Sequence, residues 1–570
     1  MKKSLPAPGN VISGFVVEAI HDLQEIRSRG ILCRHQKTGL QLYHILNDDR
    51  ENAFAFAFRT PPRDSTGIAH ILEHSVLCGS RDFPLKDPFV LLLKGSLHTY
   101  LNAWTFPDKT VYPAATVNEK DYFNIFRVYG DAVFFPLLKK EIFMQEAHHL
   151  EPLDPDNEQS PLTESGVVYN EMKGNYSSQA SIVADWAMRS LFPDTPYGVD
   201  SGGDPADIIT LTHKELQDFH AAYYHPGNCR ILLYGNIPTE TQLAFLEKEF
   251  LSRFTPREVD SVIPLQPRRT APVTMVKTYP VAPGVPLGRK TEITLNWLLA
   301  PVTDSAARTA LVVLSEILHG NAGSPLRRAL VESGWGEDYT SAAGLETELK
   351  EMTFTTGLRG TDPDQAKTIE KVVMDTLEGL VRDGLDQRLI DAALHRYEFH
   401  AREITGGHTP FALQLFRRCL KGWLHDADPT ETLLAVSKID ALKARRKTNA
   451  RLFEELIRTY LLENPHQSTV IVKPDPAYMQ AFEESLQNEI SARAGKIDPE
   501  ARARLQEELA ALKRFQTMPN DPAALASIPF LKRTDLPRHV ELIDGRDESL
   551  SDRRPLFVVP EFTNGVVYVD

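Results

Sequence analysis

The sequence has no long apolar run and an excess of acid over base, and both features narrow what the protein does. No apolar stretch approaches the roughly 20 residues that a membrane-spanning helix needs. The formal net charge is -14, whereas nucleic-acid binding requires clustered lysine and arginine. We therefore expect neither a membrane nor a nucleic acid as a partner. An acidic protein favours cationic peptides if its acidic groups face the binding site.

Cysteine is scarce, and no targeting segment is evident. The four cysteines, Cys33, Cys78, Cys229 and Cys419, are widely spaced and fit neither a disulfide framework nor a cysteine-type metal site. We expect most of them to be small buried side chains. The first ten residues carry charge without an apolar core and lack the arginine-rich pattern of a transit peptide. A bacterial cytoplasmic location is the simplest expectation, although a processed organellar protein would have the same features.

The most informative pattern present is His70-Ile-Leu-Glu73-His74. On an α-helix, positions i, i+3 and i+4 share one face, so His70 and His74 can bind one metal ion while Glu73 points into the same space. A catalytic zinc needs three protein ligands and an open position for water. Glu73 would then be the general base for a water whose pKa the metal lowers to about 7. Because such a short pattern also arises by chance, its context matters.

A second acidic segment supplies that context. Glu164 and Glu171 are seven residues apart, which is two helical turns, so a helix would place both on one side. We predict that Glu171 is the third ligand of one Zn²⁺ per chain. Glu164 is predicted to orient a ligating imidazole through its other ring nitrogen. Without the first motif, the same two residues would be typical of a solvated helix face.

Four segments together resemble the pitrilysin and insulinase family of inverzincin metallopeptidases: residues 70–80, 101–113, 164–174 and 197–204. Residues 223–228 and 233–235 are most similar to its presequence protease branch, which includes falcilysin. The resemblance covers essentially the whole chain. It implies zinc binding by His70, His74 and Glu171 and a general base at Glu73, and the sequence keeps the family's residue at all four positions.

The resemblance also implies an edge strand near the zinc at residues 101–105, to which an extended peptide adds through backbone hydrogen bonds. Asn102 and Ala103 are the predicted contacts, with Trp104 and Phe106 as pocket walls. The alternative for the two aromatic residues is a role as ordinary interior strand residues. Because backbone pairing demands no particular side chain, we expect broad specificity.

At 570 residues, the chain is too long for one core. We predict an α+β protein with a catalytic domain at residues 1–254, a linker at 255–290, a second homologous domain at 291–473, a helical hairpin linker at 474–536 and the start of a truncated third domain at 537–570. Each of the two main domains is expected to be an α/β sandwich with a mixed or antiparallel sheet and helices on one face. Strand, helix, helix and strand follow in the same order in both, but the helix at 306–319 lacks His-x-x-Glu-His.

Periodicity predicts individual elements as well. Strands are expected at 14–19, 52–59, 229–234, 292–300 and 352–358, the second of them half-buried because phenylalanine alternates with alanine. Helices are expected at 119–133, 211–224, 305–318, 324–333 and 364–383. Two long charged helices, 478–494 and 498–515, are predicted to form an αα-hairpin joined at Gly495-Lys-Ile; they are short for a dimeric coiled coil. Strands are finally expected at 556–559 and 564–570.

These patterns indicate a zinc metalloendopeptidase that degrades unfolded, targeting-peptide-like oligopeptides inside a closed chamber. The resemblance implies that the chain is an N-terminal half, and that an arginine and a tyrosine from the other half help to bind substrate and stabilise the oxyanion. The C-terminal half or a second chain would be its partner, and the isolated chain would bind zinc but cleave peptides poorly. The alternatives are a non-catalytic scaffold or substrate-presenting subunit, and a processing peptidase that cuts a precursor once.

Overall fold

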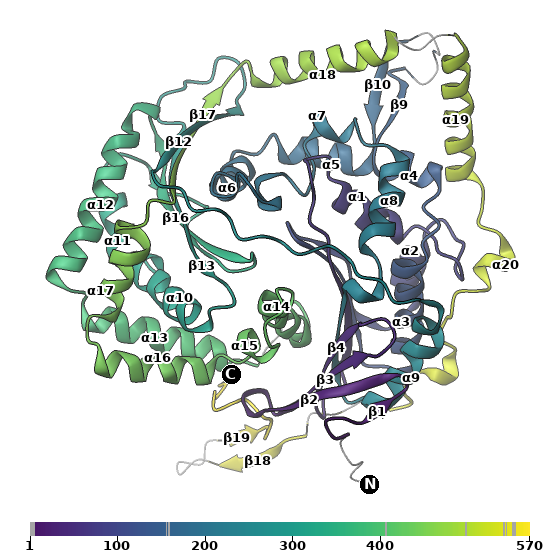
Figure 1. Cartoon of the computed structure of the whole chain (residues 1–570), viewed down its shortest axis with the longest axis horizontal. Coiled ribbons are helices and arrows are strands. Elements are labelled where there is room, and N and C mark those ends of the chain that lie inside the picture. The colour runs from purple at the N-terminus through teal and green to yellow at the C-terminus, as the bar shows by residue number, and fades with distance from the viewer. Residues whose placement is uncertain are drawn as a thin grey trace.

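The computed structural model describes residues 6–154, 157, 160–404, 407–495, 499–539, 542, 544–549 and 555–569. Two large mixed sheets lie in two successive domains (Figure 1). The first has the strand order β1-β2-β3-β4-β11-β5-β8-β6, with β7 also paired to β8. Its strands are β1 (Val11–Ile12), β2 (Phe15–Leu23), β3 (Ser28–His35), β4 (Gln41–Leu46), β5 (Asn52–Arg59), β6 (His98–Leu101), β7 (Trp104–Thr105), β8 (Lys109–Thr116) and β11 (Cys229–Gly235).

The second sheet has the order β12-β17-β13-β16-β14, with β15 also paired to β16. Its strands are β12 (Val273–Pro280), β13 (Thr291–Pro301), β14 (Asp338–Tyr339), β15 (Gly344–Glu346), β16 (Glu351–Thr361) and β17 (Gln467–Asp475). In each sheet one parallel pair, β4 with β11 or β12 with β17, precedes antiparallel strands. This shared order supports the expected duplication of an α/β sandwich.

The helices between equivalent strands follow the same order in both domains. Those of the first are α1 (Ile68–Val76), α2 (Pro88–Gly95), α3 (Glu119–Phe134), α4 (Lys140–Glu146), α5 (Val167–Asn175), α6 (Gln179–Arg189), α7 (Pro205–Ile208), α8 (His213–Tyr223) and α9 (Thr239–Glu249). Those of the second are α10 (Ser305–His319), α11 (Pro325–Glu332), α12 (Ala366–Asp383), α13 (Gln387–Arg402), α14 (Phe411–Trp423), α15 (Thr430–Leu433), α16 (Val436–Thr448) and α17 (Leu452–Ile457). Thus α1 and α2 correspond to α10 and α11.

Each domain lends a helix to the other. In β5 the phenylalanines pack on the helices of their own domain, whereas Ala53, Ala55 and Ala57 face α14 of the second domain, including Phe416 and Trp423. Helix α6 of the first domain packs in turn against β13 and β17 of the second sheet. The expected half-burial of residues 52–59 was therefore wrong, because α14 covers the alanine face and buries Asn52 to Phe58 completely.

The C-terminal helices do not form the expected αα-hairpin. Helix α18 (Tyr478–Gly495) packs on β12 and on β10 (Leu162–Ser165), which pairs with β9 (His149–Pro152), and so bridges both domains. Helix α19 (Pro499–Thr517) packs instead on α4, and Figure 1 shows the two helices at a wide angle. Of the predicted junction, Lys496 and Ile497 lie outside the described residues. The two helices therefore brace separate surfaces rather than each other.

Two other boundaries differ from expectation. The predicted linker at 255–290 contains β12, which pairs in parallel with β17 and so belongs to the second sheet. In the last segment, α20 (Pro522–Leu525) precedes a hairpin of β18 (Arg546–Ser549) and β19 (Pro555–Val558), whereas residues 564–569 form no strand and residue 570 lies outside the described residues. Within the described part of the chain, no helix has the length and apolar character to cross a bilayer.

Candidate metal centre

Helix α1 carries the His-x-x-Glu-His motif on its less buried face. Its other side packs into the first core through Ile68, Ile71 and Leu72. The helix begins after Gly67, whose φ of 67° is left-handed and where a Cβ would lie 2.6 Å from the Gly202 carbonyl oxygen. Only glycine satisfies both conditions. This close approach lets His70 Nδ1 donate to the Gly202 carbonyl oxygen at 3.1 Å, which leaves Nε2 for another ligand.

Glu171, on α5, reaches the same place. One ligand atom each from His70, His74 and Glu171 lies within 4.8 Å of the other two, and His70 Nε2 is 3.8 Å from Glu171 Oε2. Ligands of a tetrahedral zinc lie about 3.4 Å apart. Because the Glu171 side chain is 50% exposed, it has room to close the remaining gap. Two imidazoles and one carboxylate are a donor set that suits zinc and leaves a fourth position open.

His74 is held by a carboxylate that the sequence did not predict. Its Nδ1 lies 3.1 Å from Oε2 of Glu146, the last residue of α4. Burial lowers the pKa of His74, but Glu146 and the neighbouring Glu73 outweigh it and raise the pKa above its ordinary value. Burial likewise opposes ionisation of Glu146, yet its bond to His74 lowers its pKa. Glu146 therefore fixes the ring and, by accepting from Nδ1, leaves Nε2 for a metal.

Glu164 occupies a different environment from the one predicted. It lies on strand β10 rather than on a helix with Glu171, because the helix begins only after Gly166, where a Cβ would lie 2.1 Å from the Ala147 carbonyl oxygen. Its carboxylate contacts His148 Nδ1 at 3.3 Å and pairs with Arg493 of α18. The expectation that Glu164 orients a motif imidazole was thus wrong, and Glu146 makes that contact.

Glu73 meets the predicted edge strand directly. Thr105 Oγ1, on β7, donates to Glu73 Oε2 at 2.6 Å. The carboxylate also borders a cavity of about 470 Å³ together with His74, Asn102 and Ala103. Helices α2 and α19 supply further walls, among them Phe89 and Phe515. The base candidate therefore faces a space large enough for a peptide side chain.

The four predicted substrate-binding residues divide into two pairs. Asn102 is exposed and, with Ala103, borders the cavity beside Glu73. Trp104 and Phe106 are partly buried and pack against the core cluster that contains α14. The indole nitrogen of Trp104 donates to Tyr100 Oη at 2.8 Å. This placement favours the interior role for both aromatic residues, while Asn102 and Ala103 remain predicted contacts.

Three of the four cysteines are buried, and Cys78 is half-buried beside the site. Its thiol lies 3.9 Å from Glu146 Oε1 and borders the same cavity. Burial raises the pKa of Cys78, and the Glu146 carboxylate raises it further. The thiol is therefore protonated at neutral pH, which disfavours a nucleophilic role.

Comparison with known proteins assigns the chain to a family. It is 39% identical over 569 residues to presequence protease 1, chloroplastic/mitochondrial, of Arabidopsis thaliana, an alignment that covers 98% of this chain and 52% of the relative. It is 38% identical over 543 residues to Protein HypA of Clostridium perfringens, covering 95% of this chain and 55% of the relative. The chain belongs to the M16 peptidase family. It spans about half the length of these curated relatives.

The family profiles and a solved structure agree with this assignment. A profile described as "Peptidase M16 inactive domain" matches residues 210–397, and a second profile, for a region associated with the C group of M16 peptidases, matches residues 472–570. The crystal structure of pitrilysin has a TM-score of 0.54 and 16% identity, covering 88% of this chain and 50% of pitrilysin, a likeness of fold. Among the described residues, the His70, His74 and Glu171 group lies outside 210–397, and no second such group is found.

Proposed function

We propose that this M16 chain is a zinc-dependent endopeptidase subunit or half that cleaves unfolded peptides. The observation that carries the proposal is the convergence of His70, His74 and Glu171 beside Glu73. A bound zinc would lower the pKa of water and polarise the scissile carbonyl. The presequence protease relatives support a peptidase function.

The residues of the chain then have distinct tasks. His70 and His74 present Nε2 because the Gly202 carbonyl and Glu146 occupy their Nδ1 atoms. Glu73 accepts a proton from the attacking water through its carboxylate and later delivers it to the leaving amine. Thr105 holds one oxygen of that carboxylate, which leaves the other oxygen free for the water. These roles require no movement of α1.

An extended peptide is the substrate that best fits the surroundings. Strand β7 pairs with β8 and, among the described strands, with no other, so its outer edge is open to a further strand. Asn102 and Ala103, which precede β7, border the cavity at Glu73. Backbone pairing there would present successive peptide bonds to the metal with little regard to sequence. We therefore propose unfolded oligopeptides, including targeting-peptide-like ones, rather than one folded precursor.

A second polypeptide portion is proposed as the partner. The curated relatives are about twice as long as this chain. The C-terminal segment also leaves apolar side chains in solvent, with Phe557 54% exposed and Val567 82% exposed. Exposed apolar residues in such a cluster are typical of interaction surfaces. We propose that a C-terminal half or separate chain covers this segment, encloses the substrate and completes oxyanion stabilisation.

The alternative of a non-catalytic scaffold is less well supported. A scaffold needs no metal-ligand group, yet the three ligand candidates and the adjacent Glu73 are all in place. A processing peptidase would share the same site and differ in the enclosure around it. A bacterial cytoplasmic location remains our expectation for the chain, since the relatives include both a bacterial protein and an organellar one.

The proposal is tested with an unstructured peptide of about 30 residues and the zinc-loaded chain. We expect slow cleavage that a chelator abolishes and that Glu73→Gln reduces by about 10²–10⁴-fold without loss of zinc. Asp386→Asn, an exposed residue paired with Arg388, serves as the control for loss of one negative charge. Cleavage that survives in Glu73→Gln would remove Glu73 from the role of base. Rapid, complete turnover by the chain alone would contradict the need for a partner.

A further inference from the structure

The strand that touches Glu73 is short and depends on a turn. Strand β7 consists of Trp104 and Thr105 and is joined to β8 by residues 106–108. Phe106 N donates to the Lys109 carbonyl oxygen at 2.8 Å and closes this turn. Two residues of strand hold themselves weakly, so the position of Thr105 depends on what fixes the turn. The Thr105 contact with Glu73 is therefore only as well placed as residues 106–109.

Asp108 fixes the turn from within the protein. Its carboxylate is completely buried and receives Lys109 Nζ at 3.0 Å and the Tyr197 hydroxyl at 2.7 Å. His425 Nε2 lies 3.4 Å away. Burial alone would raise the pKa of Asp108, but Lys109 and His425 reverse this effect and lower it below its ordinary value. A buried charge with several partners tolerates little displacement, because any lost partner leaves it uncompensated.

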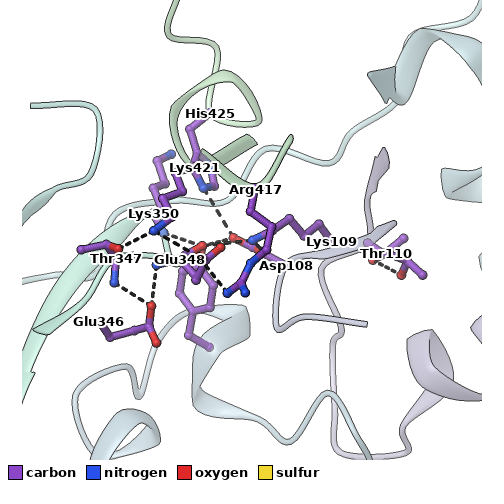
Figure 2. A network of polar contacts seen from close by, with 12 residues as sticks. Asp108, Lys109, Thr110, Glu346, Thr347, Glu348, Lys350, Arg417, Lys421 and His425 are labelled. Carbon is purple, nitrogen blue, oxygen red and sulfur yellow. Dashed lines mark hydrogen bonds and ion pairs between the residues drawn. The ribbon is translucent and has the colours of Figure 1, made fainter. Parts of the chain in front are cut away.

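The second domain supplies several contacts of this network. Figure 2 shows the loop after β15 and the end of α14 converging on Asp108 and Lys109. Lys109 Nζ donates to the Glu348 carbonyl oxygen at 3.0 Å, and Lys350 N donates to the Tyr197 hydroxyl at 2.9 Å. The carboxylate of Glu348 is in turn paired with Arg417 and Lys421 of α14. Residues distant in sequence thus clamp one turn of the first domain.

A second set of ion pairs strengthens the same attachment. Asp426, directly after His425, pairs with Arg59 of β5 at 3.1 Å and with Arg230 of β11 at 2.6 Å. The segment that presents His425 is therefore anchored to the first sheet. This arrangement explains how a domain in which no metal-ligand group is found among the described residues can influence the metal-bearing one.

We propose that Asp108 is a positioning residue: with Tyr197, Lys109 and the second-domain loop at Glu348, it holds the β7–β8 turn so that Thr105 keeps the Glu73 carboxylate in place. The proposal rests on the proposed peptidase function for its kinetic consequence. Its structural consequence, order in residues 104–110 that depends on the second domain, is independent of catalysis. The two consequences can be measured separately.

The kinetic test is a double-mutant cycle on the zinc-loaded chain with the same peptide at saturation. We expect Asp108→Asn and Thr105→Val each to lower kcat by roughly tenfold or more, with KM and zinc content nearly unchanged. Thr105→Ser, which keeps the hydroxyl, should restore the rate. The double variant should be no slower than the slower single variant, because both changes break one chain of contacts. Effects that multiply in the double variant would overturn the proposed connection.

The structural test is hydrogen–deuterium exchange read by mass spectrometry. In Asp108→Asn, amides at residues 104–110 should exchange at least several times faster, while those of α1 and α12 stay unchanged. Asp386→Asn should match the unaltered chain throughout. Unchanged exchange at 104–110 would overturn the proposal even if the chain proves inactive on peptides, so failure of the proposed function is distinguishable. Tyr197→Phe, which removes only a hydroxyl, serves in both tests if Asp108→Asn does not fold.

Discussion

His74 of α1 and Glu146 of α4 are hydrogen-bonded at 3.1 Å although 72 residues separate them in sequence. The bond joins the motif helix to the element on which α19 packs. It also decides which nitrogen of His74 faces the predicted metal. The carboxylate that completes the site electrostatically is thus Glu146, whereas Glu164 joins α18 to β10 through Arg493.

This distinction predicts different effects for two matched substitutions. Glu146→Gln should weaken zinc binding by about 10–100-fold, because the neutral amide orients His74 less strongly and no longer favours its Nδ1–H. Glu164→Gln should leave zinc affinity unchanged, since its carboxylate contacts His148 and Arg493. Competition titration with a zinc-binding dye measures both. A larger loss of affinity in Glu164→Gln than in Glu146→Gln would reverse the assignment.

Local patterns predicted the elements of the site but not the contacts between them. The alternation of phenylalanine and alanine at 52–59 and the spacing of His70, Glu73 and His74 depend on neighbouring residues, and the structure forms β5 and α1 there. Glu146 belongs to no such pattern, because its partner is distant in sequence. Glu164 and Glu171 have helical spacing, but Gly166 and the crowded Ala147 carbonyl end the strand between them.

The exchange of helices between the domains was equally beyond local pattern. The apolar stripe of α14 predicts that one face is buried, yet it does not say which sheet covers it. Only the complete fold shows that Phe416 lies on the alanine face of the first sheet. For the same reason, β12 could not be separated from the proline-rich stretch that surrounds it, since its parallel partner β17 lies almost 200 residues later.

The α14 contact predicts a large stability effect from one side chain. Phe416 is fully buried in the cluster between α14 and β5, so Phe416→Ala should destabilise the chain by about 3–5 kcal/mol. Phe399→Ala on α13 is the control, because that ring is 47% exposed and should change stability far less. Urea unfolding followed by tryptophan fluorescence measures both. Equal effects of the two substitutions would mean that α14 does not cover the first sheet.

Two buried histidines predict acid sensitivity. Burial lowers the pKa of His44 to about 3 and that of His466 to about 4, and both side chains are fully buried. Since the unfolded chain protonates histidine near pH 6.5, stability should fall as pH drops below about 6.5 and should continue to fall to about pH 4. At pH 5.5 each histidine should lower stability by roughly 1.4 kcal/mol.

The acid effect is measured from thermal midpoints at pH 7.5 and 5.5. His44→Gln should reduce the difference between the two midpoints, because it removes one group that must stay neutral in the fold. His400→Gln, whose side chain is 63% exposed, should leave the difference unchanged. If His44→Gln has the same pH dependence as the unaltered chain, His44 is not the source of the acid sensitivity.

The most direct measurement of the central claim is a crystal structure of the zinc-loaded chain with anomalous diffraction recorded at the zinc absorption edge. We predict one strong anomalous peak per chain, about 2.0–2.2 Å from His70 Nε2, His74 Nε2 and a Glu171 carboxylate oxygen, with Glu73 close by but not bound. A map without a peak between these three side chains, or with its zinc bound elsewhere, would contradict the assignment of a zinc peptidase.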